Sequence, residues 1–290
     1  VDVSERPQEV TVLGRRLSLP VILGPTGLMR MVDHAGELAA ARAAEKFGTV
    51  SVQSSGASVS LEDVARSVTT PQWFQLYPWG DRRTIEHLIG RARDAGYAAM
   101  VVTVDVPVVG AREKDLRNGL TVPPEVSPRT GWDVLRHPRW LASLLTHPKP
   151  TYANFVGLMP DARGTSGLAA HTMGMLNPGH TWRDLEWMVE RFGGPVVLKG
   201  VMTAEDARRA VETGCRAVVV SNHGGRQADS VPAAIDVLPE IADEIGGEAD
   251  VLLDGGIRRG SDVVKALALG ATACLIGRPW VYGLGAGGTA

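Results

Sequence analysis

Eight short apolar runs recur along the 290-residue chain, and each is followed by glycine, proline or polar residues. Their apolarity is continuous and rich in β-branched side chains, which is typical of parallel strands that are covered on both faces. The runs are "PVILGPTG" (20–27), "GTVSVQSSG" (48–56), "WFQLYP" (73–78), "AAMVVTVDVP" (98–107), "PVVLKG" (195–200), "AVVVSNHGG" (217–225), "DVLLDGG" (250–256) and "ATACLIGR" (271–278).

Helical patterns lie between these runs. Two of them, "GELAAARAAEKFG" and "DRRTIEHLIGRARDAG", stop at a glycine. A third begins with Thr203 as N-cap and has Asp206 three residues later, and a fourth opens on Ser261 and ends at Gly270. Strands that alternate with helices in this way predict an α/β chain folded as a (β/α)8 TIM barrel. An open, doubly wound parallel sheet is the alternative.

The alternation breaks twice. Residues 108–194 separate the fourth run from the fifth, so we expect a long insertion that forms a lid, a binding loop or a partly disordered segment. The chain ends in "PWVYGLGAGGTA", where we predict no eighth helix and therefore a chain trimmed from a longer protein. Together with its insertion, the chain is predicted to form one barrel domain over residues 1–290.

Composition excludes several classes of protein. Hydrophobic residues make up 44% and charged residues 21%, and a net charge of −2 gives no overall field that attracts nucleic acid. No apolar run reaches about 18 residues, the length of a spanning helix, and no signal peptide is visible. Cys215 and Cys274 lie far apart and the histidines show no ligand spacing. We therefore expect inert thiols, no metal site and a cytoplasmic location.

Polar side chains stand at the ends of five predicted strands. A barrel places its chemistry at the carboxyl ends of its strands, and residues two apart on a strand share a face. These polar residues are Gln75 and Tyr77, Thr103 and Asp105, Ser221 and His223, and also Lys199 and Asp254. Their clustering predicts an active site at this mouth of the barrel.

The motif "SNHGGRQ" provides a base next to a cation. His223 follows the strand, Gly224 and Gly225 permit a sharp turn, and Arg226 can return to the same cavity. This pair suits a substrate whose reacting C–H or O–H adjoins a carboxylate, because arginine can hold a carboxylate with two parallel bonds. A hydrogen-bonded core histidine with a surface arginine is the alternative.

Glycine-rich segments after the last two predicted strands indicate an anion-binding site. The segments "LLDGGIRRGSD" and "IGRP" place Arg258 and Arg278 beside exposed backbone N–H groups, as in the usual phosphate site of a barrel. A tight turn with solvated arginines would give the same pattern.

One set of motifs extends over nearly the whole chain: "PTG", "QSSGASVSLEDVA", "WFQLY", "TVDVPVVGAREKDLRNGL", "VVLKG", "SNHGGRQ", "LLDGGIRRGSDVVKALALGA" and "IGR". This set resembles the FMN-dependent L-2-hydroxy acid oxidoreductases, which include glycolate and lactate oxidases and mandelate dehydrogenases. The mandelate dehydrogenase branch is the most similar, through "GPTGL", "REKDL" and "HPRW" followed by "ANF".

The resemblance implies FMN as the cofactor. It implies that Pro25, Thr26 and Gly27 line the flavin edge and that Lys199 lies by N1 and C2=O. The other cofactor-binding residues that it implies are Ser54, Gln75 and Thr103 at the polar atoms of the flavin, Ser221 as a further contact to the cofactor, and Asp254, Gly256, Arg258, Gly277 and Arg278 at the ribityl chain and phosphate.

The resemblance also implies how the substrate binds. Its carboxylate would lie between Arg226 and Arg112, and Tyr77 would bond to the substrate. His223 would take the proton, and Asp105 would stabilise the resulting imidazolium. In the family an N-terminal segment with a further tyrosine helps to bind the carboxylate, and this chain begins after it.

Two glycines bear on the substrate and on the acceptor. Gly56 stands where glycolate oxidases carry a tryptophan, so we expect room for a larger, aromatic substrate side chain. Gly27 stands where oxidases often have alanine, which opens space near the reactive edge of the flavin and favours a dehydrogenase.

We therefore predict FMN-dependent oxidation of a mandelate- or lactate-like L-2-hydroxy acid to the 2-oxo acid, with a quinone or another carrier as electron acceptor. The alternatives are an oxidase that uses O2, an FMN-barrel isomerase without net redox chemistry, and an inactive flavin-binding barrel. The resemblance also implies a homo-oligomer, namely a tetramer.

Part of the insertion has a composition suited to a membrane interface. The segment "RTGWDVLRHPRWLASLL" mixes Trp132 and Trp140 with Arg129, Arg136 and Arg139. At the inner face of a membrane, a dehydrogenase could pass electrons to a quinone. The alternative is a helix packed on its own barrel. We expect the methionines within residues 173–175 to pack in the lid.

Overall fold

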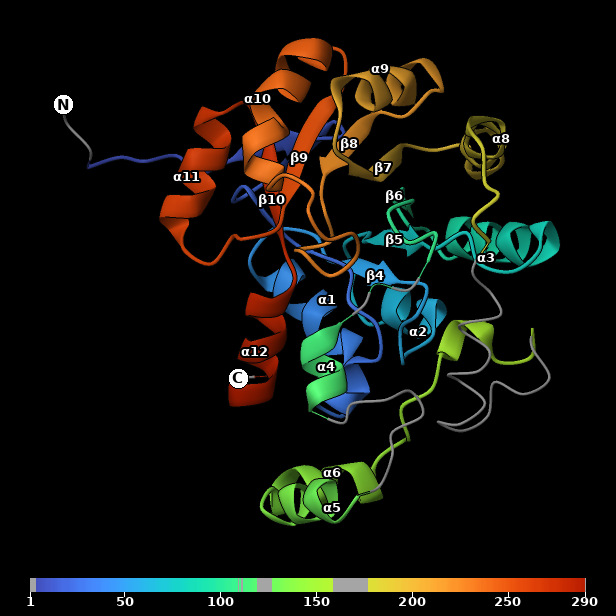
Figure 1. The fold of residues 1–290 in the computed structure, drawn as a ribbon, viewed down its shortest axis with the longest axis vertical. Coiled ribbons are helices and arrows are strands. Elements are labelled where there is room, and N and C mark those ends of the chain that lie inside the picture. The colour runs from blue at the N-terminus through green and yellow to red at the C-terminus, as the bar shows by residue number, and fades with distance from the viewer. Residues whose placement is uncertain (1–3, 109, 111, 119–126, 159–176, 290) are drawn as a thin grey trace.

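The centre of the molecule is a ring of parallel strands. The computed structural model describes residues 4–108, 110, 112–118, 127–158 and 177–289 (Figure 1). The eight strands of the ring are β3 (Val21–Leu23), β4 (Val52–Ser54), β5 (Trp73–Leu76), β6 (Ala99–Thr103), β7 (Val196–Val201), β8 (Ala217–Val220), β9 (Asp250–Asp254) and β10 (Ala273–Ile276).

These strands form a closed barrel. Neighbours pair in parallel in the order β3-β10-β9-β8-β7-β6-β5-β4. The two ends of this row meet, because the Leu23 N–H donates to the Val50 carbonyl oxygen at 3.0 Å and Leu23 also bridges to Ser51. The predicted (β/α)8 barrel is therefore confirmed, and the open doubly wound sheet is excluded.

Helices cover the outside of the ring, and several of their ends agree with the sequence. Gly48 and Gly96 follow the helices of residues 37–46 and 82–94 with positive φ of 65° and 80°. Thr203 caps its helix by accepting the N–H of Asp206. The covering helices are α1 (Glu37–Lys46), α2 (Leu61–Arg66), α3 (Arg82–Asp94), α8 (Trp182–Phe192), α9 (Ala204–Glu212), α10 (Ala234–Ile245), α11 (Gly260–Ala268) and α12 (Arg278–Gly287).

The prediction that no eighth helix follows the last strand was wrong. The glycine-rich end of the chain forms α12, whose first turn contains Pro279, a residue well suited to that position. Leu284 is buried, and the Trp280 indole N–H donates to the Gly24 carbonyl oxygen at 3.1 Å. These tertiary contacts outweigh the poor helix propensity of glycine.

Two apolar cores lie on the two sides of the ring. One core joins outward strand residues such as Val218 and Val220 to the covering helices. The other fills the barrel and contains Val197, Val219 and Leu252 together with further strand residues, but no residue of the covering helices. Because side chains alternate along a strand, polar residues two positions beyond the inner set must extend the barrel interior to its mouth.

A small hairpin closes the opposite end of the barrel, and the sequence prediction missed it. Strands β1 (Val10–Val12) and β2 (Arg15–Leu17) pair in antiparallel fashion. Val12 and Leu17 belong to the inner core, and the Leu13 N–H donates to an Asp250 carboxylate oxygen at 2.7 Å. The amino-terminal end of the barrel is thus sealed by apolar side chains.

The insertion between β6 and β7 extends away from the barrel. Its described elements are α4 (Glu113–Arg117), α5 (Pro128–Leu135), α6 (Pro138–Thr146) and η2 (Ala153–Phe155), and α5 and α6 lie together below the barrel in Figure 1. The Trp140 indole N–H donates to the Met31 carbonyl oxygen at 2.8 Å, and the rings of His34 and His147 stack at 4.1 Å. The methionines within 173–175 lie outside the described residues.

The long excursion ends before α8, which covers the barrel next to α3. In the part of the chain that the structure describes, no helix is both long enough and apolar enough to span a bilayer.

Glu37 ties together the loops that follow β3 and β4. It is 4% exposed and accepts the N–H groups of Met29 and Ser58 at 3.1 and 2.9 Å, while the Ser58 hydroxyl donates to it at 3.0 Å. Burial raises the pKa of Glu37, and the hydrogen bonds from Ser58 and Met29 offset this only in part. These two loops also carry Gly27 and Gly56.

We expect Glu37→Ala to lower the free energy of unfolding by about 2–4 kcal/mol, because two buried N–H groups lose their acceptor. Glu37→Gln keeps an acceptor oxygen and should cost less. Urea unfolding followed by circular dichroism measures both, with the exposed Glu190→Ala on α8 as control. An Ala variant as stable as this control would contradict the role of Glu37.

The stability difference between the wild type and Glu37→Gln should also depend on pH. Because the folded-state pKa of Glu37 is raised, its ionisation opposes folding. The wild type should therefore lose stability relative to Glu37→Gln as the pH rises above about 4.3, the pKa of an unperturbed glutamate. Urea titrations at a series of pH values test this, and a constant difference would contradict it.

Candidate active site

Lys199 occupies the centre of the barrel mouth and is 3% exposed. Its Nζ lies 3.0 Å from Asp254 Oδ2 and 3.8 Å from Asp105 Oδ2, and it donates to the Ser221 hydroxyl at 2.8 Å. Burial alone would lower the pKa of Lys199, but the two carboxylates outweigh it and the pKa is raised. A fixed positive charge therefore stands at the top of the inner core.

Asp105 and His223 form a hydrogen-bonded pair beside this cation. His223 Nδ1 lies 2.9 and 3.1 Å from the two Asp105 oxygens. Burial would raise the pKa of Asp105, but the bond to His223 and the charge of Lys199 prevail and lower it. Gly200 permits this arrangement, since a Cβ there would lie 2.7 Å from Asp105 Cβ. An ionised Asp105 holds the proton on Nδ1 and leaves Nε2 as the basic atom.

Tyr77 faces the basic nitrogen of His223. Its hydroxyl lies 3.5 Å from His223 Nε2, and its ring stacks on Trp79 at 4.5 Å. Burial raises the pKa of Tyr77 to about 12, so the phenol remains protonated at neutral pH. Tyr77 can therefore donate a hydrogen bond to a ligand placed between itself and the imidazole.

Two guanidinium groups border the same space. Arg226 is bound to Asp115 of α4 at 3.0 Å, and Arg112 donates to the Gln227 side chain at 3.4 Å. Burial and then the neighbouring charge of Arg226 lower the pKa of Arg112. The two neighbouring guanidinium groups, of which Arg226 is held by Asp115, can together bind an anion. Asp115 was missed as a site residue, although it stands in "REKDL", one of the motifs used for the resemblance.

A buried row of side chains joins three neighbouring strands at the mouth. The Ser54 hydroxyl donates to Gln75 Oε1 at 2.9 Å, and Gln75 Nε2 donates to the Thr103 hydroxyl at 3.0 Å. All three side chains lie in line with the inner core, as the alternation along the strands requires.

The loop after β3 contacts the loop after β4. The Leu28 N–H donates to the Gly56 carbonyl oxygen at 3.0 Å, and a Cβ at Gly27 would lie 2.8 Å from that oxygen. Only glycine fits position 27 without movement of one loop. Pro25 and Thr26 precede it, and the Thr26 hydroxyl lies 3.4 Å from the Gly24 carbonyl oxygen.

The loops after β9 and β10 have free space beside two of their glycines. Cβ atoms at Gly256 and Gly277 would meet no atom within 4 Å, and Arg278 donates to the Gly224 carbonyl oxygen at 2.9 Å. Arg258 is exposed, and its backbone N–H donates a hydrogen bond to Asp262 Oδ2 at the start of α11. Among the described residues, Asp254 Oδ1 is buried without a hydrogen-bond partner and is ready to accept from a ligand.

Comparison with known proteins identifies relatives over the whole chain. A family model described as FMN-dependent dehydrogenase matches residues 1–290. An L-lactate oxidase of Nostoc sp. is 46% identical over 295 residues, which cover 100% of this chain and 75% of the relative. Glycolate oxidase 5 of Oryza sativa is 41% identical over 293 residues, which cover 100% of this chain and 73% of the relative.

Solved structures share the fold. The structure of the monotopic membrane protein (S)-mandelate dehydrogenase matches with a TM-score of 0.94 at 40% identity, over 100% of this chain and 76% of that one. A mandelate oxidase with (S)-4-hydroxymandelic acid matches with a TM-score of 0.83 at 40% identity, over 99% and 75% of the two chains. The chain therefore belongs to the FMN-dependent dehydrogenase family.

Proposed function

We propose that this protein oxidises an L-2-hydroxy acid to the 2-oxo acid, with FMN as cofactor and His223 as the base. The observation that carries the proposal is the alignment of Asp105, His223 and Tyr77 next to the paired arginines Arg112 and Arg226. A base, a neutral hydrogen-bond donor and an anion site fit the hydroxyl and the carboxylate of one small molecule.

The remaining mouth residues fit FMN. Asp254 Oδ1 lacks a donor, and the ribityl hydroxyl groups of FMN would provide one. The open glycines after β9 and β10 and the nearby Arg278 suit a phosphate, and Lys199 suits the electron-rich side of the flavin ring. Bound FMN supplies the acceptor for two electrons. The proposed cofactor-binding set is Pro25, Thr26, Gly27, Ser54, Gln75, Thr103, Lys199, Ser221, Asp254, Gly256, Arg258, Gly277 and Arg278.

The protein's own groups then act in sequence. Arg112 and Arg226 bind the substrate carboxylate, and Tyr77 donates a hydrogen bond to the substrate. His223 Nε2 accepts the proton that the substrate releases as it is oxidised. The negative charge of Asp105 stabilises the imidazolium through the Nδ1 hydrogen bond. Partial burial of Asp105 and His223 strengthens their interaction by limiting access of water.

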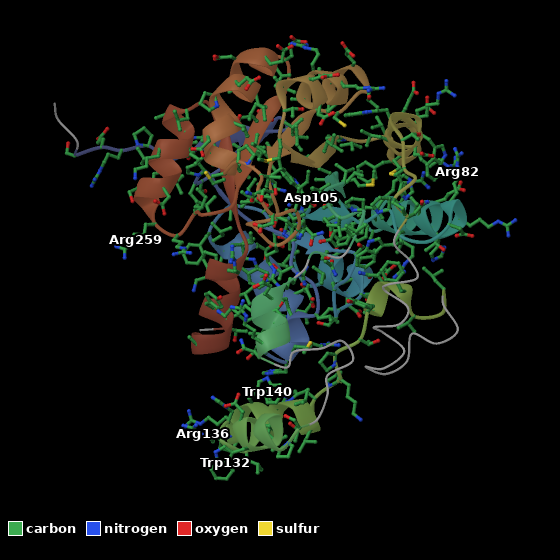
Figure 2. All side chains as sticks on the ribbon, viewed as in Figure 1. Arg82, Asp105, Trp132, Arg136, Trp140 and Arg259 are labelled. Atoms are coloured by element: carbon green, nitrogen blue, oxygen red, sulfur yellow. The ribbon has the colours of Figure 1, made fainter. Side chains whose placement is uncertain are left out.

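The arm formed by α5 and α6 supports a membrane-bound electron acceptor. Trp132, Leu135 and Leu145 are 66%, 64% and 73% exposed, and Arg136 and Arg139 are exposed beside them. Figure 2 shows Trp132 and Arg136 at the end of the molecule far from Asp105. Exposed tryptophan and leucine among arginines suit the interface of an anionic bilayer. We therefore propose a quinone as the acceptor rather than O2.

Anaerobic absorbance spectroscopy of the FMN-loaded protein tests the chemistry. L-Mandelate or L-lactate should bleach the flavin band, and His223→Ala should retain FMN but react about 10²–10⁴-fold more slowly, because the base is gone. Asp105→Asn should also slow the reaction, because the imidazolium loses its counter-charge. His87→Ala, an exposed histidine on α3, is the control. Retained FMN that no 2-hydroxy acid bleaches would overturn the proposed function.

Vesicle flotation tests the arm. The wild type should float with anionic liposomes, and replacing Trp132, Leu135 and Leu145 together by serine should abolish flotation, because their apolar area drives insertion. A matched control replaces Phe47 and Val264, which are 61% and 65% exposed on the barrel, by serine. Equal flotation of the arm variant and this control would contradict the membrane proposal.

A further inference from the structure

The space beside Gly56 is bordered by the ring of Tyr152. A Cβ built at Gly56 would lie 3.3 Å from Tyr152 Cε1 and 3.6 Å from Cδ1, so even an alanine would press on the ring. The absence of a side chain at position 56 is thus matched by an aromatic side chain from the far end of the insertion. Tyr152 therefore borders the space that a side chain at position 56 would have filled.

Tyr152 belongs to an aromatic cluster that reaches Tyr77. Trp79 stacks on Tyr77 and meets the Tyr152 ring edge-to-face at 6.4 Å. Phe155 completes the cluster, with ring centroids 6.1 Å from Trp79 and 6.5 Å from Tyr152. Tyr152 is also among the groups whose charge bears on the pKa of Tyr77 and of Arg112. The cluster therefore joins the outer apolar core to Tyr77 and so extends to the proposed substrate.

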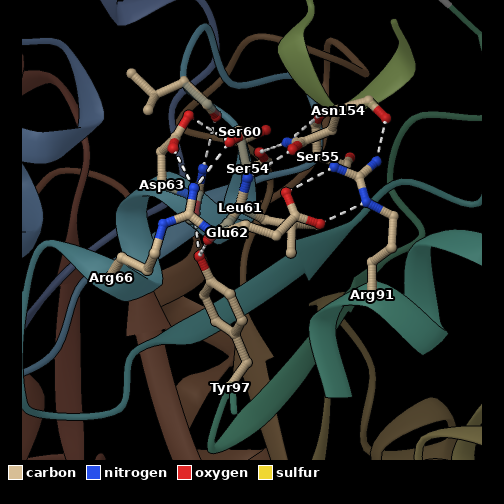
Figure 3. Close-up of polar contacts among 12 residues, drawn as sticks. Ser54, Ser55, Ser60, Leu61, Glu62, Asp63, Arg66, Arg91, Tyr97 and Asn154 are labelled. Atoms are coloured by element: carbon tan, nitrogen blue, oxygen red, sulfur yellow. Dashed lines mark hydrogen bonds and ion pairs between the residues drawn. The ribbon is translucent and has the colours of Figure 1, made fainter. Parts of the chain in front are cut away.

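Asn154 fixes the backbone that carries Tyr152. Its side chain is fully buried, its Oδ1 accepts the Leu61 N–H at 2.8 Å, and its Nδ2 donates to the Ser55 carbonyl oxygen at 3.1 Å (Figure 3). The Ala153 N–H donates to the Ala57 carbonyl oxygen at 3.0 Å. Segment η2 is thereby bound to the loop on which Gly56 lies.

An ion pair between Arg91 and Glu62 contacts the backbone of Asn154. Arg91 donates to the Asn154 carbonyl oxygen at 2.7 Å, and its Nε and Nη2 bond to the two oxygens of Glu62 at 2.7 and 2.9 Å (Figure 3). The hydrogen bond from Arg91 outweighs partial burial and lowers the pKa of Glu62. A two-bonded Arg–carboxylate pair is a rigid contact, so α2 and α3 together determine where η2 lies.

We propose that Tyr152 is the wall that limits the size of the substrate side chain, and that Asn154 is a positioning residue for this wall. The inference rests on the proposed function and narrows its substrate class. The subsite would take 2-hydroxy acids with a methyl group or a single flat aryl ring. Side chains larger than phenyl would collide with the Tyr152 ring, because Asn154 and its partners prevent η2 from withdrawing.

Selectivity between a one-ring and a two-ring substrate tests the wall. In Tyr152→Ala, kcat/KM for 2-naphthylglycolate relative to L-mandelate should rise at least about tenfold, since even one methylene in a pocket changes selectivity by 10–200-fold. The ratio should stay unchanged in Tyr152→Phe, which keeps the ring. A ratio within twofold of the wild type in Tyr152→Ala would overturn the proposal.

Asn154→Ala should shift the same ratio in the same direction, although Asn154 contacts no substrate. Arg91→Lys, which keeps the charge but loses the two-bonded contact with Glu62, is a milder second variant. The control is Arg66→Ala, which removes the nearby exposed Arg66–Asp63 ion pair on α2 and should leave the ratio unchanged. Folded Asn154 and Arg91 variants with the wild-type ratio would overturn the positioning role.

A binding measurement separates this inference from the proposed chemistry. Calorimetric titration with phenylacetate and 2-naphthylacetate, which lack the reacting hydroxyl, gives dissociation constants that involve no turnover. Tyr152→Ala should tighten the naphthyl ligand at least about tenfold relative to the phenyl ligand. This shift would support the wall even if no hydroxy acid bleached the flavin. Unchanged relative affinities would overturn the wall even if bleaching occurred.

Discussion

The mouth of the barrel depends on one buried charge, that of Lys199. An ammonium group removed from water is strongly destabilised unless opposite charges and hydrogen bonds surround it. Asp254, Ser221 and Asp105 provide these from three other strand ends, and Asp105 in turn orients His223. The charge that holds the mouth together is thus coupled to the proposed base. Removal of Lys199 or of either carboxylate would leave the remaining charges unbalanced, so structure and chemistry constrain each other here.

Period-two alternation explains why much of this mouth could be predicted from the sequence. Trp73 lies in the inner core, so Gln75 and Tyr77, two and four residues later, continue the same face of the chain toward the mouth. The same rule places Thr103 and Asp105 beyond Val101 and Ala99 on the next strand. The place of a polar residue in such a position follows from the strand alone, without knowledge of which strands pair.

Residues outside the strands could not be placed by that rule. Asp115, Tyr152 and Asn154 belong to the insertion, where no periodicity relates position in the chain to position in space. Their contacts join segments about 100 residues apart, such as Asn154 with Ser55, and only tertiary folding brings these together. The last helix was missed for a different reason: local glycine propensity opposes it, and the burial of Leu284 overrides that propensity.

Closure of the ring has a consequence for the timing of folding during synthesis. Strand β3 pairs with β10, and Val21 lies opposite Cys274, about 250 residues later in the chain. At ribosomal rates this gap corresponds to roughly 10–50 s. During that interval one edge of β3 has no partner, and Gly24 in the loop that follows β3 lacks its hydrogen bonds to Ile276 and Trp280. A nascent chain of this design would therefore present an unpaired apolar strand to chaperones or to other nascent chains until β10 emerges.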